Sequence, residues 1–248
     1  MKRILSPAIS LLNKLNYSLK FSVFGVIVIS AFMVISLYLI SHINQTISTT
    51  ETQLEGLDKI KTASLVVQLI QEHRGHSAVI KTIERQNGLS EYEHLSQQTA
   101  IQQKVSSLFY KVESTYPATL LEDSNWHAIN STWHYLINKN STMGLNDGFT
   151  SHTQLIEKLL AFQRLTADYY QLSIAPDLGT HYLLDTVLIQ LPYSIETLGQ
   201  MRAKGVTILA NKQASISQKD ELNALILSLK RPLKFLKKNL RQSSDANS

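Results

Sequence analysis

The sequence contains no cysteine, and it has only nine glycines and five prolines among its 248 residues. The lack of cysteine excludes disulfide bonds, thiolate catalysis, iron-sulfur clusters and zinc sites built from cysteine. The few glycines and prolines lie between long periodic segments rather than at short regular intervals, which is typical of helical proteins. No alternation of apolar and polar residues continues for more than a few positions. The sequence therefore predicts an all-α fold.

Motifs that carry catalysis are missing as well. The chain has no glycine-rich phosphate loop, no HExxH pattern and no GxSxG pattern. His73, His76 and His94 do not form a metal-binding pair four residues apart on one helix. We therefore predict no catalytic residue, no cofactor and no metal, and we do not expect an enzyme.

One uncharged apolar run, FSVFGVIVISAFMVISLYLIS, covers residues 21–41. At about 1.5 Å per helical residue it is long enough to cross the roughly 30 Å hydrocarbon layer of a bilayer. The alternative is a cleaved signal peptide, but the run exceeds the 7 to 15 apolar residues usual there, and no clean cleavage site follows. We predict a single transmembrane helix.

The charges around this run predict its orientation. Lysine and arginine are frequent in residues 1–20, whereas the segment HINQTISTTETQLEG after the run has neither. By the positive-inside rule, residues 1–20 form a cytoplasmic basic tail and residues 42–241 form an extracytoplasmic domain. In a bacterium this means an inner-membrane protein with a periplasmic domain, followed by a disordered tail at residues 242–248.

The formal net charge of +5 does not point to nucleic acid. The basic residues are divided between the N-terminal tail and the segment LKRPLKFLKKNLR near the C-terminus, so they share no single binding face. For the C-terminal segment two interpretations remain open, namely a solvated helix end and a contact with anionic lipid. We expect the membrane, but no nucleic acid, as a partner.

Caps and breaks divide the extracytoplasmic domain into long helices joined by short loops. The first helix continues from the membrane segment to about residue 86, and the next covers 90–116. A shorter helix starts near residue 123, another covers 151–173, a long one that Pro192 kinks covers 180–211, and the last covers 217–241. This pattern predicts one or two four-helix bundles.

Arg74 interrupts the apolar face of the first helix. On a helical wheel that face includes Val66, Val67, Ile70 and Ile80, and Arg74 falls inside it together with His73 and Ser77. A buried guanidinium stays charged, so it needs a carboxylate of the protein or an anion from solution. Arg74 is therefore a candidate ligand-binding residue, with His73 and Ser77 beside it.

The helix that follows Thr180 repeats this feature. Leu184, Leu191, Ile195, Leu198 and Leu209 share one face of the wheel, and Arg202 lies in its middle. Glu196 and Lys204 lie on other faces. Two arginines on core-facing stripes could converge on one small oxyanion or carboxylate. The alternative is that each arginine pairs with an aspartate at the core edge or extends to solvent.

Two stretches of the chain resemble a known family. The first contains Gln71, Arg74, Gly75 and Ser77, and the second contains Asp177, Tyr182, Asp185, Leu191, Pro192, Leu198, Gly199, Arg202 and Gly205. They are similar to the sensory regions of bacterial chemoreceptors and sensor kinases, in particular to the nitrate- and nitrite-sensing (NIT) helical domain. The resemblance covers roughly residues 57–212.

This resemblance implies two stacked four-helix bundles in which Arg74 and Arg202 face an anion. His73 stands where the family commonly has glutamate, so the predicted ligand is a small anion or carboxylate and not specifically nitrate. Receptors of this type continue into a second membrane helix and a cytoplasmic signalling module. The chain is accordingly a fragment, a truncated product, or a sensor that passes its signal to a partner.

The leading hypothesis is an extracytoplasmic ligand-sensing domain that binds a small anion between helices and signals through the membrane helix, as a homodimer. The ligand-binding residues would be Arg74, Arg202, His73 and Ser77. The alternative is a ligand-free helical dimerisation module of a membrane-anchored protein, in which the arginines pair internally.

Overall fold

The computed structural model describes residues 16–84, 91–139, 142–174, 177–211 and 213–246. Its contacts divide the chain into two compact units, residues 1–51 and residues 52–248. All regular structure in the described ranges is helical, and the predicted all-α class is confirmed. The first unit contributes no part of the site described below.

The described part of the first unit is the beginning of a long helix, α2 (Tyr17–Glu84). Its large apolar side chains are exposed, for example Phe21 at 75% and Phe32 at 72%. This helix is long and apolar enough to cross a membrane, although a signal sequence would satisfy the same criteria. The predicted apolar N-terminal helix is therefore present.

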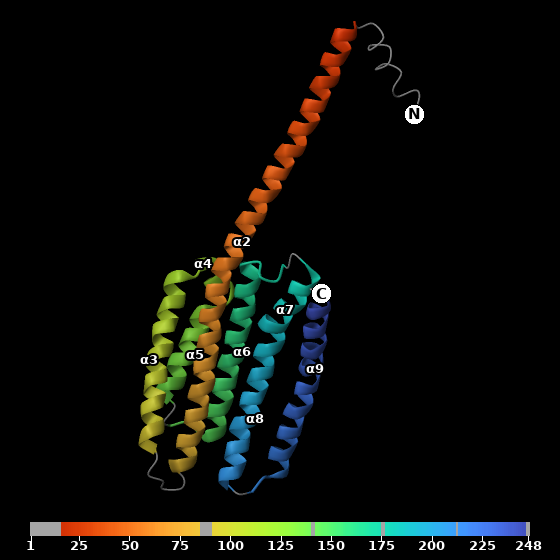
Figure 1. The fold of residues 1–248 in the computed structure, drawn as a ribbon. Coiled ribbons are helices and arrows are strands. Elements are labelled where there is room, and N and C mark those ends of the chain that lie inside the picture. Colours follow the sequence, from red (N-terminus) through yellow and green to blue (C-terminus); the bar gives the residue numbers. More distant parts are fainter. Residues whose placement is uncertain (1–15, 85–90, 140–141, 175–176, 212, 247–248) are drawn as a thin grey trace. The chain divides into compact units, whose positions relative to one another are not determined.

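The second unit contains the remainder of α2 and the helices that follow it (Figure 1). They are α3 (Glu91–Thr115), α4 (Ala118–Asp123), α5 (Trp126–Lys139), α6 (Leu145–Tyr169), α7 (Leu178–Asp185), a π-helical segment (Thr186–Gln190), α8 (Leu191–Asn211) and α9 (Ile216–Ala246). The residues predicted to end the first helix and to cap the second, Gln86 to Ser90, lie outside the described ranges.

Helices α2, α3, α5 and α6 contribute most of the side chains of the apolar core. Each of them contributes side chains with almost no solvent exposure, such as Ile70, Val105, Trp133 and Leu155. Trp133 lies 6.4 Å from Phe109, and Phe109 lies 4.8 Å from Trp126, measured between ring centroids. Aromatic rings at these separations pack favourably. The tryptophans of α5 therefore lie in the core, in the middle of an aromatic cluster.

The break between α7 and α8 follows from Pro192. Proline has no backbone N–H and its ring clashes with the carbonyl four residues earlier, so the regular ladder cannot pass through it. The chain inserts the π-helical turn Thr186–Gln190 immediately before this proline. The expectation that Pro192 distorts the helix without ending it agrees with this arrangement.

Several predicted helix ends differ from the structure; for example, the helix predicted to end at residue 173 ends at Tyr169. Helix α6 begins at Leu145, because Asp147 favours the first turn and nothing interrupts the helix before Ser151, the predicted cap. Helix α9 begins after Ser215, whose hydroxyl accepts from Gln218 N–H while Gln218 Oε1 accepts from Ser215 N–H. This reciprocal capping box replaces the cap predicted at Ser217.

Helix α9 also extends to Ala246, so residues 242–246 are helical and do not form the predicted disordered tail. The extension packs against the rest of the unit, since Ser243 is 9% exposed. Arg241 and Asp245 form an exposed pair one turn apart at 4.0 Å, which favours continued helix in this segment.

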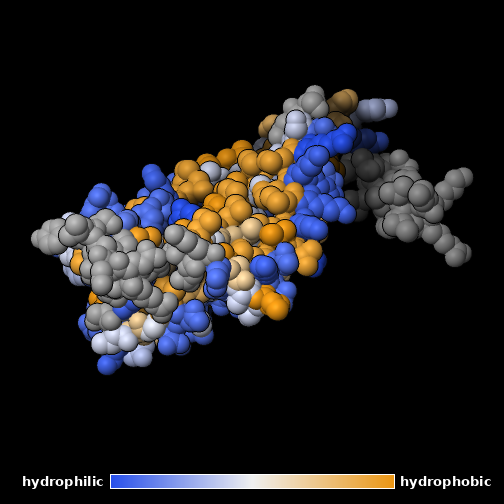
Figure 2. All heavy atoms as spheres, turned by 90° about the horizontal axis from the view of Figure 1, so that it is seen from below, coloured by the Kyte–Doolittle hydropathy of each residue, from blue (hydrophilic) through white to orange (hydrophobic). Residues whose placement is uncertain are grey.

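Much apolar surface remains exposed. Figure 2 shows a broad area of hydrophobic residues bordered by hydrophilic ones. In the second unit, α8 exposes Leu191, Ile195, Leu198 and Leu209, with exposed fractions of 40% to 78%. The prediction that these four residues face the core is wrong, because α8 buries the polar side chains of Ser194 and Glu196 instead.

Candidate functional site

Arg74 of α2 is buried and forms an ion pair with Glu196 of α8. The exposed fraction is 2% for Arg74 and 4% for Glu196. Arg74 Nη1 donates to Glu196 Oε1 at 2.6 Å and Nη2 donates to Oε2 at 3.1 Å. This two-pronged geometry is the strongest arrangement available to a guanidinium and a carboxylate. The positive charge that the sequence placed in the core is therefore balanced by the protein itself.

Other polar groups complete this pair. Glu196 also accepts from Gln71 Nε2 and Gln200 Nε2, each at 2.9 Å, and Arg74 Nη1 donates to Thr153 Oγ1 at 3.1 Å. Two buried charges are tolerated when their remaining hydrogen-bonding positions are filled in this way. The network joins α2, α6 and α8, so it fixes the rotation of α8 about its own axis.

This rotation explains the exposed leucines. The wheel placed Glu196 away from the core-facing stripe of α8, but the structure turns Glu196, Gly199 and Ala203 inward and the apolar stripe outward. A Cβ atom added to Gly199 would lie 3.0 Å from Arg74 Nη2, so a larger residue there would displace the guanidinium by a few tenths of an ångström. Burial of an unpaired arginine costs several kcal/mol, which outweighs half-burying a few leucines.

A cavity of about 290 Å³ lies beside this pair. It is lined by Gln71, Glu72, Arg74, Gly75, His76, Ala78, Val79, His94, Gly199, Arg202, Ala203 and Val206. The two arginines predicted to converge on one site therefore line the same cavity, from α2 and from α8. Arg202 is exposed, and no ion pair joins it to any residue that the structure describes. A Cβ atom on Gly75 would lie 3.9 Å from Arg202 Nη2, so the guanidinium extends over this glycine.

Two histidines face each other on the wall of this cavity. His76 Nδ1 of α2 lies 3.1 Å from His94 Nδ1 of α3. Burial lowers the pKa of His76, the neighbouring His94 and Arg202 lower it further, and Glu72 acts in the opposite direction. Within the described ranges no group of three histidine or acidic side chains is arranged to hold a metal ion. Among the described residues, the cavity therefore combines Arg202, which has no ion-pair partner there, with an imidazole whose pKa is lowered.

His73 and Ser77, the other two predicted ligand-binding residues, have internal partners. His73 Nδ1 lies 2.8 Å from His152 Nε2, and Gln102 Nε2 lies 3.0 Å from His73 Nε2. Ser77 is 6% exposed, and its hydroxyl accepts from Gln98 Nε2 at 2.6 Å. Neither residue lines the cavity at Arg202. Their predicted role in ligand binding stays a prediction.

The pKa values of the two buried histidines, His73 and His152, are strongly lowered. Burial, aided by the charge of its histidine neighbours, lowers the pKa of His73 to about 3. Burial also lowers the pKa of His152 to about 4, although the hydrogen bond between its Nδ1 and the carbonyl of Gly148 opposes the shift. Both imidazoles are therefore neutral near pH 7, and one donates to the other across the contact between α2 and α6.

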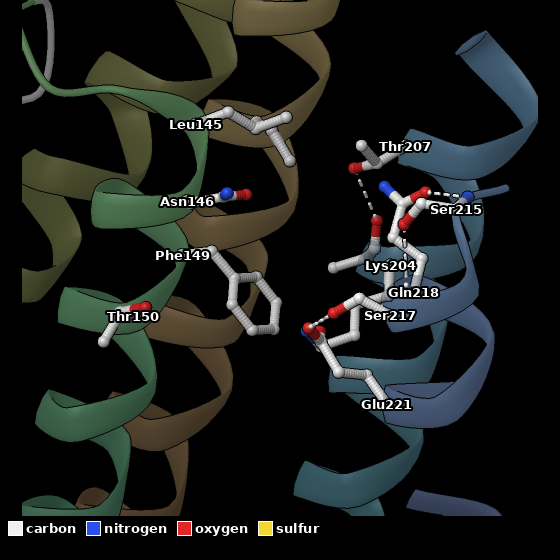
Figure 3. A pocket seen from close by; sticks show the side chains of 12 residues that line it. Leu145, Asn146, Phe149, Thr150, Lys204, Thr207, Ser215, Ser217, Gln218 and Glu221 are labelled. Carbon is white, nitrogen blue, oxygen red and sulfur yellow. Dashed lines mark hydrogen bonds and ion pairs between the residues drawn. The ribbon is translucent and has the colours of Figure 1, made fainter. Parts of the chain in front are cut away.

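A second and larger cavity, of about 470 Å³, lies between α6 and the paired helices α8 and α9. Figure 3 shows Phe149 on one wall and Lys204, Ser217, Gln218 and Glu221 on the other. Lys204 forms an ion pair with Glu221 and its Nζ lies 4.9 Å from the centre of the Phe149 ring. Sequence reasoning missed this cavity, because lysine and glutamate on two different helices leave no spacing signal.

Comparison with known proteins found no matching family model, no similar curated protein and no similar solved structure.

Proposed function

We propose that the chain is a membrane-anchored sensor of a bacterial signal-transduction system, whose extracytoplasmic domain binds a small anion or carboxylate in the cavity at Arg202. The observation that carries the proposal is the exposed Arg202 on a cavity of about 290 Å³, with no ion-pair partner among the described residues. Pockets of this size suit small ligands, and a guanidinium fork suits a planar oxyanion.

The two arginines would have different roles, because they have different partners. Glu196 already neutralises Arg74, so Arg74 holds α8 against α2, while Arg202 is free to bind the ligand. An anion on Arg202 would also lie near His76 of α2, which lines the same cavity. Binding would therefore connect α2 with α8, and α2 is the helix that carries the apolar segment.

Two further features support a sensor. The apolar N-terminal run and its flanking charges favour one membrane span with a cytoplasmic N-terminus and a periplasmic domain. The two motif stretches resemble NIT-type sensory regions, and both reach this cavity, through Arg74 and Gly75 and through Gly199 and Arg202. The output would be a cytoplasmic signalling module or a partner protein of the chemotaxis or sensor-kinase type.

Calorimetric titration of the full chain in detergent with nitrate, nitrite and acetate tests the proposal. We expect one of these anions to bind, and Arg202→Ala to weaken binding by roughly 10- to 100-fold, the value of a lost charged hydrogen bond. Arg164→Ala removes an exposed arginine of α6 and is the matched control. Equal affinity in Arg202→Ala and the unchanged chain would overturn the site.

The pH dependence of the same titration adds a second criterion. A bound anion favours protonated His76, so the affinity should rise as the pH falls from 8 through the lowered pKa of this imidazole. His76→Gln should remove the dependence without abolishing binding. A pH-independent affinity would show that the anion does not lie near this histidine.

A second candidate function is favoured by a different observation. The apolar face of α8 formed by Leu191, Ile195 and Leu198 is exposed, and Arg74 is already paired inside the protein. A homodimer that covers this face would remove several half-exposed leucines from water, each worth about 1 kcal/mol. If none of the anions binds, a ligand-free dimerisation module is the better description of the chain.

A further inference from the structure

One face of α9 is densely cationic. Its exposed lysines and arginines are Lys230, Arg231, Lys234, Lys237, Lys238 and Arg241. At 100° per residue they fall within about a third of the helix circumference, opposite the buried Leu229, Asn239 and Ser243. No acidic residue occurs between Glu221 and Asp245. This stripe therefore carries six positive charges and no negative one.

Apolar side chains border this stripe. Leu233, Phe235 and Leu240 are 52%, 37% and 51% exposed, and the guanidinium of Arg231 lies 5.7 Å from the centre of the Phe235 ring. Lysines flanked by exposed leucine and phenylalanine are the composition of helices that bind at the surface of a bilayer, where the rings and leucines enter the headgroup layer.

The stripe also lies at the end of the second unit that is nearest, along the chain, to the apolar segment. Asn239 donates to Asp185 at 2.6 Å, which fixes the C-terminal half of α9 against α7. Gln53 of α2 donates to the carbonyls of Gln171 and Ile174, in the connection just before α7. Figure 1 shows the C-terminal end of α9 at the same end of this unit as the start of its α2 segment.

Covalent connection keeps this end close to any bilayer that holds residues 21–41. Twelve peptide units separate residue 41 from Gln53, which limits the distance between them to roughly 40 Å even for an extended chain. Bilayers that contain phosphatidylglycerol carry a negative surface potential that attracts lysine and arginine. The tether supplies a high effective concentration of membrane, so weak contacts suffice.

We propose that the cationic face of α9, Lys230 to Arg241, docks on the anionic lipid headgroups of the membrane in which the chain is anchored. This inference rests on the membrane anchoring of the proposed function but not on anion binding at Arg202. Docking through six cations would orient the second unit on the bilayer surface. It would also make that orientation depend on lipid charge and on salt.

The absence of cysteine from the chain gives a direct test. Ser244→Cys, on an exposed position of α9, can be labelled with a polarity-sensitive fluorophore in the full chain. The labelled protein is placed in nanodiscs of phosphatidylcholine alone or mixed with phosphatidylglycerol. We expect a blue shift of the emission only in the anionic nanodiscs, and its loss at high salt. Ser107→Cys on α3 is the control position and should show no shift.

Charge removal tests the residues themselves. The triple variant Lys230→Gln, Lys234→Gln, Lys237→Gln should shift the docking equilibrium about a hundredfold toward the undocked state, at about fivefold for each lysine. The control triple Lys104→Gln, Lys139→Gln, Lys158→Gln removes the same charge from α3, α5 and α6 and should keep the emission shift. Equal emission in both kinds of nanodisc, or an unchanged shift in the α9 triple, would overturn the proposal.

Two further measurements distinguish a failure of lipid docking from a failure of membrane anchoring. Flotation of the labelled chain with phosphatidylcholine vesicles reports anchoring alone, so a chain that floats but shows no emission shift contradicts only the docking. A chain that does not float contradicts the anchoring and the docking together. If a short DNA duplex binds the stripe more tightly than anionic nanodiscs at equal phosphate concentration, lipid is the wrong partner class.

Discussion

Lowering the pH from 7 to 5 should strongly destabilise the second unit, because two fully buried imidazoles are neutral in the folded state. The pKa is about 3 for His73 and about 4 for His152 in the folded protein, compared with an ordinary value of 6.5. Between these values the unfolded chain binds a proton at each histidine that the folded chain does not. Stability is therefore complete above pH 6.5 and decreases as the pH falls below it.

The size of the effect follows from proton linkage. Each histidine contributes a slope of about 1.4 kcal/mol per pH unit once the pH is well below 6.5, and the two together contribute about 2.7. Between pH 7 and pH 5 the loss sums to about 4 kcal/mol, which is a large share of an ordinary unfolding free energy of 5 to 15 kcal/mol. The lowered pKa of His76 acts in the same direction, with a smaller weight because this side chain is partly exposed.

Acidic residues do not obscure this window. The pKa values of Asp177 and Glu221 are lowered by hydrogen bonds to Thr180 and Lys204, respectively. A depressed carboxylate contributes stability above its unfolded pKa, near 4, and loses it only as the pH falls further. A loss of stability between pH 7 and pH 5 therefore reports the protonation of histidines.

Urea unfolding of the full chain in detergent measures the effect through tryptophan fluorescence. The chain has two tryptophans, Trp126 and Trp133, and both are buried in the core that contains His73. We expect the slope between pH 6 and pH 5 to fall by half in His152→Leu, whatever the stability of that variant at pH 7. His127→Gln, at an exposed position of α5, should keep the full slope. A nearly flat profile from pH 7 to 5 in the unchanged chain would refute the assignment of two neutral buried imidazoles.

Two further predictions use the same unfolding assay. Glu196→Gln should destabilise the chain by about 3–5 kcal/mol, because Arg74 stays buried without a countercharge. Glu221→Gln, at the partly exposed pair with Lys204, should cost at most about 1 kcal/mol. Equal losses of stability in the two variants would contradict the importance of burial. Gly56→Ala places a Cβ atom 2.4 Å from Tyr170 Cβ and should destabilise the chain by about 1–3 kcal/mol. Gly205→Ala, where no heavy atom lies within 4 Å of the added Cβ, should stabilise α8 by about 0.5–1 kcal/mol. An unchanged stability in Gly56→Ala would show that α2 and the end of α6 can separate freely.

The helical class and the apolar N-terminal segment could be predicted because both depend on local patterns. Apolar residues at helical spacing, few glycines and prolines, and one long uncharged run each carry their signal within a single segment. The burial of Arg74 and His73 on α2 was predicted in the same way, since the surrounding apolar face of α2 is continuous. Arg74 and Arg202 line one cavity, and their predicted role in binding an anion there stays a prediction.

The rotation of α8 could not be predicted from its own hydrophobic pattern. The wheel assigns the core to the most apolar face, but α8 lies opposite a buried arginine and therefore turns its carboxylate and its glycine inward. That choice depends on a residue 122 positions earlier in the chain. The pairs between His73 and His152 and between His76 and His94 are similar, because each joins two helices whose register the sequence does not reveal.

The rotation of α8 also determines what the two arginines can do. Glu196 and Arg202 are six residues apart, which places them about 120° apart around the helix. Glu196 therefore binds Arg74, while Arg202, further along α8, extends its guanidinium over Gly75 into the cavity. Both side chains lie at the boundary between α2 and α8. Glu196 is paired with Arg74 within the protein, whereas Arg202 lines the cavity. Under the proposed function, a ligand on Arg202 would add to, or compete with, the contact between Arg74 and Glu196, and ligand binding would then change the position of α2.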